Sequence, residues 1–226
     1  MSQFLVKIIE FINVVVEYTP KFIPGVIITL QLSFFSILLG TILGFIVTMF
    51  KMSKLKPLMK ATDMYVGLVR GTPLLLQLIF IFYALPEIGI SLPPFSSAVI
   101  GLAFHNGAYI SEIFRGAIES IDYGQREAAQ SLGMTKWQSM KRIILPQAFK
   151  RSVPALGNQF IIAVKDSSLA SVITITEIIM LARQYTAATF NPWPMLFIAG
   201  GYYLIITTIL SKGLLIIENR LKVYER

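Results

Sequence analysis

Long apolar runs without charge alternate along the chain with shorter segments in which charged residues gather. About 20 consecutive apolar residues are enough to cross the hydrocarbon core of a bilayer. The pattern therefore predicts five membrane spans, of which the second is short and the fourth is interrupted by Lys165 and Asp166. The predicted spans cover about residues 22–50, 71–86, 88–111, 152–180 and 184–211.

Basic residues set the expected orientation of these spans. The loops 86–94 and 182–192 carry a single charged residue each, whereas most lysines and arginines lie in three other segments. Because basic loops stay on the cytoplasmic side, the N-terminus is predicted outside and the C-terminus inside, which agrees with an odd number of spans. We expect an all-α protein with one transmembrane domain over residues 1–226. The basic segments are 51–70, 115–151 and 212–226.

The first 20 residues place apolar side chains at roughly helical spacing between charged ones. This pattern predicts an amphipathic helix that lies on the outer membrane surface. Lys7, Glu10 and Glu17 interrupt the apolar stretch, so the segment does not fit a signal peptide.

Composition narrows the possible chemistry. Only 14% of the residues are charged, against about a quarter in a soluble domain. The net charge of +8 fits cytoplasmic loops facing anionic membrane lipid better than nucleic acid, which is not expected as a partner. The chain has no cysteine and one histidine, which excludes disulfides and multi-histidine metal sites. It lacks a phosphate-binding G-x-x-x-x-G-K-[ST] motif, so no cofactor, ATP included, is expected on this chain.

The longest predicted loop, 115–151, carries start and stop signals for two short helices with a sharp turn between them. Each helix is expected to begin with a capping box, in which two residues three apart satisfy each other's free backbone N–H groups. A glycine typically follows the last turn of a helix, and proline marks a break. The signals are, in order, Asp122 with Gln125, Leu132 before Gly133, Thr135 with Gln138, and Pro146.

The same loop contains a longer pattern. Glu-Ala-Ala is followed after three residues by glycine and after nine more by Ile-x-Leu-Pro. This spacing resembles the EAA loop of the membrane subunits of ABC importers, which implies a type I importer fold. The resemblance implies that the loop is a coupling helix that docks into a separate ATPase subunit. The residues concerned are Glu127, Ala128, Ala129, Leu132, Gly133, Ile143, Leu145 and Pro146.

Further segments, among them Arg115 to Ile118, Gly124-Gln125 and Ser131 to Met134, resemble the polar amino acid branch of that family, whose members include histidine, glutamine, arginine and cystine permeases. The resemblance covers about residues 65–180, and the flanks match in hydropathy only. The other segments are Arg70 to Leu75, Gly107 to Glu112, Pro154 to Asn158 and Lys165 to Leu169.

The resemblance implies a permease subunit, not an enzyme, that moves polar amino acids by alternating access in the cytoplasmic membrane of a prokaryote. The expected partners are an ATPase dimer that holds ATP-Mg, a second permease subunit, identical or not, and an extracellular or periplasmic solute-binding protein.

Polar side chains inside the spans are candidates for substrate contact, because they are costly there unless they face a partner or a cavity. Asp166 is suited to hold an ammonium group, while Ser167 and Ser168 either donate to a carboxylate or satisfy broken backbone. Gln77 and Asn106 complete the substrate-binding set. A gating or structural role is expected for Thr72, Tyr109, Glu112, Asn158 and Lys165.

Alternative interpretations remain at this point. Lys165 and Glu112 are a candidate structural ion pair, and His105 is expected to be buried and hydrogen-bonded. A self-sufficient carrier would use Asp166 or Glu112 as an ion site, but the chain shows no internal repeat. An intramembrane protease is disfavoured, since Asp166 is its only candidate aspartate and His105 has no G-x-S-x-G partner.

Overall fold

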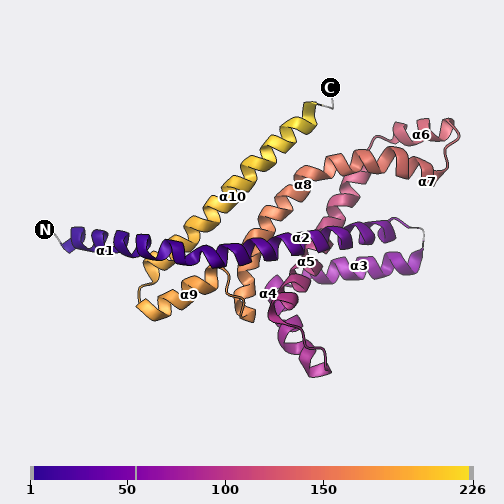
Figure 1. Cartoon of the computed structure of the whole chain (residues 1–226). Coiled ribbons are helices and arrows are strands. Elements are labelled where there is room, and N and C mark those ends of the chain that lie inside the picture. Colours follow the sequence, from indigo (N-terminus) through magenta and orange to yellow (C-terminus); the bar gives the residue numbers. More distant parts are fainter. Residues whose placement is uncertain (1–2, 54, 224–226) are drawn as a thin grey trace.

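The computed structural model describes residues 3–53 and 55–223, and these form helices and turns without any strand. Two basic loop residues, Lys54 and Arg226, lie outside the described residues. The described helices form an elongated bundle, with α1 at one end and the short helices α6 and α7 at the other (Figure 1). The ten α-helices are α1 Gln3–Tyr18, α2 Ile23–Lys51, α3 Lys56–Gly71, α4 Leu74–Ile79, α5 Pro94–Glu119, α6 Tyr123–Ser131, α7 Lys136–Ser139, α8 Leu145–Asp166, α9 Ile178–Thr189 and α10 Pro192–Val223.

The helix predicted for the first 20 residues exists as α1, and the first predicted span corresponds to α2. A single 3-10 turn, η1 (Thr19–Phe22), joins them into one helical stretch of 49 residues. None of the α1 side chains is buried. Its position on the membrane surface stays a prediction.

The centre of the bundle is the contact between α2 and α5, which small residues bring close together. A Cβ atom on Gly44 would lie 2.9 Å from the Gly107 carbonyl oxygen and 2.8 Å from Cγ2 of Ile110. The Thr48 hydroxyl, one turn further along α2, donates to the Ser111 carbonyl oxygen of α5 over 2.9 Å. Small residues allow such close backbone approach between membrane helices.

A sharp corner replaces the start of the second predicted span. α3 and the helical stretch Leu74–Ile88 meet at 106°, so the span predicted from residue 71 begins at Leu74. This stretch changes from α4 to a π-turn, η2 (Phe80–Ala84), and ends in a 3-10 turn, η3 (Leu85–Ile88). The third span, predicted over 88–111, is α5, which begins only at Pro94 and runs on to Glu119. The hydropathy pattern did not predict the part of α5 after residue 111, because polar residues begin there.

The break predicted at Pro146 is wrong. α7 continues through a π-turn, η4 (Met140–Ile144), directly into α8, so the second helix of the loop is long. Proline lacks an N–H and its ring clashes with the carbonyl one turn earlier. The wider π-turn lies just before Pro146 and accommodates it, because such turns re-space the backbone bonds. The fourth predicted span, placed at residue 152, therefore belongs to a helix that begins well before it.

The helices near the last two predicted spans, 152–180 and 184–211, have other limits than those spans. After Asp166 the chain narrows into a 3-10 turn, η5 (Ser167–Ile173), and Thr174 adopts a left-handed φ of 71°. α9 follows as a separate helix, and Phe190, with φ 54°, turns the chain into α10. The run 184–211 lacks charged residues and was therefore predicted as one span, although Asn191-Pro192 inside it signals a turn.

Two helical stretches, Gln3–Lys51 and Pro192–Leu221, are long and apolar enough to cross a membrane. A third results if the bent pair formed by α3 and Leu74–Ile88 counts as one span. α5 and α8 are also long but carry more polar side chains.

Candidate functional site

The end of α8 is the clearest irregularity among the predicted site residues. α8 stops at Asp166, where the last carbonyl groups of a helix lack partners. The Ser167 hydroxyl donates to the Val164 carbonyl oxygen over 2.8 Å, and the Ser168 hydroxyl donates to that of Lys165 over 2.6 Å. Both serines therefore satisfy broken backbone, which is one of their two predicted roles. Their contact with a substrate stays a prediction.

The Asp166 carboxylate is half-buried and has no hydrogen-bond or ion-pair partner in the described part of the chain. Lys165 is exposed. The ion pair predicted as an alternative between Lys165 and Glu112 does not form. Glu112 instead contacts Lys51 and Arg115, each over 2.8 Å, because Arg115 lies one turn further along the same helix and the end of α2 packs beside it.

Glu112 is the centre of an ionic cluster that joins α2, α3 and α5. Three carboxylates and three cations alternate in it, and the Glu112 side chain is only 19% exposed. Such a network holds three helix ends in register more firmly than isolated surface pairs do. The remaining pairs are Lys51 with Asp63 at 3.2 Å, Arg115 with Glu119 at 2.6 Å, and Arg70 with Glu112 at 4.0 Å.

Asn106 links α5 to α8 inside the bundle. Its side-chain oxygen accepts a hydrogen bond from the Gln159 amide over 2.9 Å, and both residues are buried. The Asn106 amide nitrogen is buried without an acceptor among the described residues. Such contacts are typical of polar side chains between membrane helices. Asn158, the neighbour of Gln159, is exposed.

Gln77 closes the corner between α3 and α4. Its amide nitrogen lies 2.9 Å from the Val69 carbonyl oxygen, 3.2 Å from that of Thr72 and 3.0 Å from the Thr72 hydroxyl. These carbonyls have no helical partner, since the chain turns there. The Gln77 oxygen lies 3.2 Å from Nδ1 of His105, so the histidine is hydrogen-bonded as predicted, but it is half-buried rather than buried.

Tyr109 lies one turn along α5 from His105, and their ring centroids are 5.0 Å apart. The Arg70 guanidinium lies over the Tyr109 ring at 5.4 Å, within the range of a cation–π contact. The half-buried residues His105, Tyr109 and Glu112 thus form a polar stripe along α5.

The caps predicted for the long loop are largely confirmed. Asp122 accepts from the Gly124 N–H over 2.7 Å, but the reciprocal bond expected from Gln125 is absent. Thr135 and Gln138 form a complete capping box. Gly133 has a φ of 79°, and it ends α6 as predicted, because glycine adopts this left-handed conformation without strain.

One face of α6 is exposed, and the opposite face packs against the helix bundle. Glu127, Ala128 and Leu132 are exposed, Leu132 to 81%, whereas Ala129 is buried. Behind them, Ile143 and Leu145 pack against a cluster around Ile118, Ile144 and Ala148, and Pro146 is exposed. The loop is thus a rigid, capped helix pair with an uncovered face.

Sequence reasoning missed Glu177. Its carboxylate is fully buried and accepts from the N–H groups of Ile179 and Met180, each over 2.8 Å, at the start of α9. The Tyr203 hydroxyl of α10 donates to the same carboxylate over 2.8 Å. Acidic residues are enriched near helix starts, so a lone glutamate before an apolar run is a helix-start signal that could have revealed this site.

The all-helical fold of the described residues is that of a type I ABC importer permease. The chain belongs to the family described as binding-protein-dependent transport system inner membrane component, whose model matches residues 36–223. The resemblance inferred from the loop is confirmed. The chain is accordingly a permease subunit, and ATPase activity resides in a separate subunit in this family.

Several relatives and solved structures match nearly the whole chain. The L-cystine transport system permease protein TcyB of Bacillus subtilis (strain 168) is 41% identical over 209 residues, which cover 92% of this chain and 89% of that protein. The arginine transport system permease protein ArtQ of the same organism is 38% identical, covering 90% and 93%. A crystal structure of an amino acid ABC transporter with histidines matches with a TM-score of 0.89 and 39% identity, covering 93% of this chain and 98% of that one.

Proposed function

We propose that this chain is the membrane subunit of an ATP-driven importer for polar amino acids in the cytoplasmic membrane of a prokaryote. The observation that carries the proposal is the 39% identity to an amino acid ABC transporter over 93% of the chain. The cystine and arginine permeases among its relatives support the same substrate class. The identity of the transported amino acid is to be determined by measuring uptake.

The test is uptake into proteoliposomes that contain the chain with its ATPase and solute-binding protein. We expect labelled amino acids to accumulate only when ATP is present on the ATPase side. The control is a vesicle with a proton gradient and no ATP. Accumulation driven by that gradient alone would support the self-sufficient carrier and refute the importer.

We infer an N-outside, C-inside orientation with five spans, in which α2, the stretch Leu74–Ile88, α5, α8 and α10 cross. The basic loop segments support it through the positive-inside rule. The natural absence of cysteine makes this easy to test with single cysteines. An impermeant maleimide added to intact cells should label Glu87→Cys but not Lys136→Cys. Labelling of both, or the reverse pattern, would contradict the orientation.

Asp166 is proposed as the residue that holds the substrate ammonium or a cationic side chain. Its half-buried carboxylate without a partner, at the point where α8 loses its regular turns, supports this role. We expect Asp166→Asn to raise KM at least tenfold while the complex still assembles. Asp63→Asn is the matched control, because Asp63 is an exposed aspartate already paired with Lys51. Unchanged uptake kinetics in Asp166→Asn would make the residue structural.

The exposed face of α6 is proposed to dock into a dimeric ATPase, beside a second permease subunit. Its caps and the uncovered side chains of Glu127 and Leu132 support this. We expect Glu127→Ala to separate ATP hydrolysis from uptake without loss of the folded chain. Gly133→Pro should do so by distorting the turn after α6, because proline cannot adopt the φ of 79° found there, while the helices of the bundle stay folded. Lys60→Ala, at an exposed position of α3, is the control. Normal uptake in both loop variants would count against docking here.

A further inference from the structure

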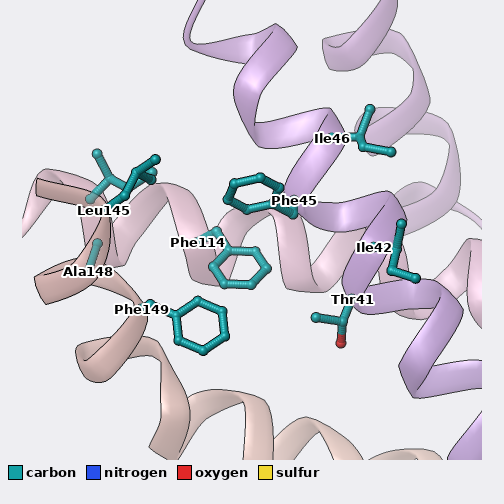
Figure 2. Close-up of a pocket in the computed structure, with 9 residues that line it drawn as sticks. Thr41, Ile42, Phe45, Ile46, Phe114, Leu145, Ala148 and Phe149 are labelled. Carbon is teal, nitrogen blue, oxygen red and sulfur yellow. The ribbon is translucent and has the colours of Figure 1, made fainter. Parts of the chain in front are cut away.

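An apolar groove of about 370 Å³ lies between α2, α5 and α8 (Figure 2). The rings of Phe45, Phe114 and Phe149 meet in it, with Phe114 5.6 Å from Phe45 and 6.1 Å from Phe149 between centroids. Phe149 is 54% exposed and Ile42 is 53% exposed. The groove therefore offers aromatic and aliphatic surface that no other described part of the chain covers.

The groove faces away from the polar stripe of α5. Phe114 follows His105 by nine residues, which is two and a half turns at 3.6 residues per turn, so the two point in opposite directions. The same spacing separates Phe149 from Asn158 on α8. The groove therefore lies on the side of α5 opposite its polar stripe, and the exposed side chains of Ile42 and Phe149 open it to the surroundings of the chain.

Three cations lie close in sequence to the α8 residues that line this groove. Lys150 follows Phe149 directly, and Lys141 and Arg142 precede Leu145 by about one turn. All three are exposed and have no ion-pair partner within residues 3–53 and 55–223. Arg151, in contrast, is already occupied, since its guanidinium donates to the Ser120 carbonyl oxygen over 2.5 Å.

We propose that the groove binds an acyl chain of an anionic phospholipid, whose phosphate is held by Lys141, Arg142 and Lys150. Cations beside apolar surface at the cytoplasmic side of a membrane helix bundle are suited to such lipids. A second copy of this chain fits the groove less well, because a symmetric contact would bring the same three cations together. The proposal rests on the cytoplasmic placement of this end, proposed above, and not on the transported substrate.

The test measures which lipid reaches the groove. Phe149→Trp is made in the full chain with Trp137 and Trp193 replaced by phenylalanine, and the protein is reconstituted in phosphatidylcholine bilayers. Brominated acyl chains quench tryptophan only on contact. We expect brominated phosphatidylglycerol to bind at least tenfold more strongly than brominated phosphatidylcholine, because each nearby cation contributes about fivefold.

Three controls make the result decisive. Replacing Lys141, Arg142 and Lys150 by glutamine should abolish the preference for phosphatidylglycerol while quenching by phosphatidylcholine persists, and Lys60→Gln should leave the preference unchanged. A tryptophan in place of Leu38, an exposed α2 residue outside the groove, should show no preference. Phe45→Trp repeats the measurement if Phe149→Trp does not fold.

Two outcomes would overturn the proposal. Equal quenching by both lipids would mean that the groove meets bulk lipid only, and absence of quenching by either would mean that protein covers it. Neither readout depends on uptake, so failure here is distinguishable from failure of the importer assignment.

Discussion

The buried carboxylate of Glu177 is expected to contribute strongly to the free energy of unfolding of the chain. Glu177→Ala removes the acceptor for two N–H groups at the start of α9 and for the Tyr203 hydroxyl. Loss of an N-cap costs about 0.5–2 kcal/mol, and a buried donor left without an acceptor costs about 1–3 kcal/mol more. We therefore expect the free energy of unfolding to fall by about 2–4 kcal/mol.

Two companion variants separate the contributions. Tyr203→Phe removes one donor and should cost about 1 kcal/mol, in keeping with interhelical hydrogen bonds in membrane proteins. In the Glu177→Ala background, the Tyr203→Phe change should be nearly neutral, because the pair is already broken. The assay is unfolding of the purified chain by SDS in mixed micelles, followed by circular dichroism. Equal small costs for both single variants, with no coupling between them, would refute the reasoning.

Three further predictions concern packing, capping and charge. Gly44→Leu should prevent α2 from approaching Gly107 and lower the yield of folded chain sharply, as size-exclusion chromatography in detergent would report, whereas Gly67→Leu, at an open position, should not. Thr135→Ala should cost about 1 kcal/mol in the same unfolding assay, because it removes a complete capping box. Glu112→Gln should destabilise the chain more at low salt than at high salt, because it leaves its cation partners unneutralised; a salt-independent effect would contradict this.

The membrane class, the helical fold and the caps of the loop followed from local pattern, because charge, glycine and cap residues act over a few positions. The limits of several helices did not. The charge-free run over 184–211 was taken as one span, although Asn191-Pro192 directly after Phe190 is a turn signal and Phe190 itself adopts a positive φ. Pro146 suggested a break that the π-turn before it avoids. Both outcomes depend on tertiary packing, which overrides local preference.

The candidate site also contains residues that could be predicted from the sequence and residues whose contacts could not. The residues of the α6 face could be predicted, because their spacing is contained in one loop. The partners of Gln77, Asn106 and Glu112 could not, since each lies on another helix. Glu177 was missed although it lies inside the fourth predicted span, because hydropathy does not show which polar residues of a span are buried. Only the fold shows that its carboxylate is buried.

The unbroken path from α7 through η4 into α8 has a mechanical consequence. At 1.5 Å per residue this path is a rod of roughly 45 Å. It begins with α7, next to the exposed helix α6, and ends at Asp166. A rod carries a push applied at one end to the other, but this one has a soft joint where the π-turn and Pro146 weaken the backbone ladder. Bending should concentrate at this joint. A tilt of α6 and α7 should therefore move the Asp166 end of α8 sideways about the joint rather than rotate α8 about its own axis.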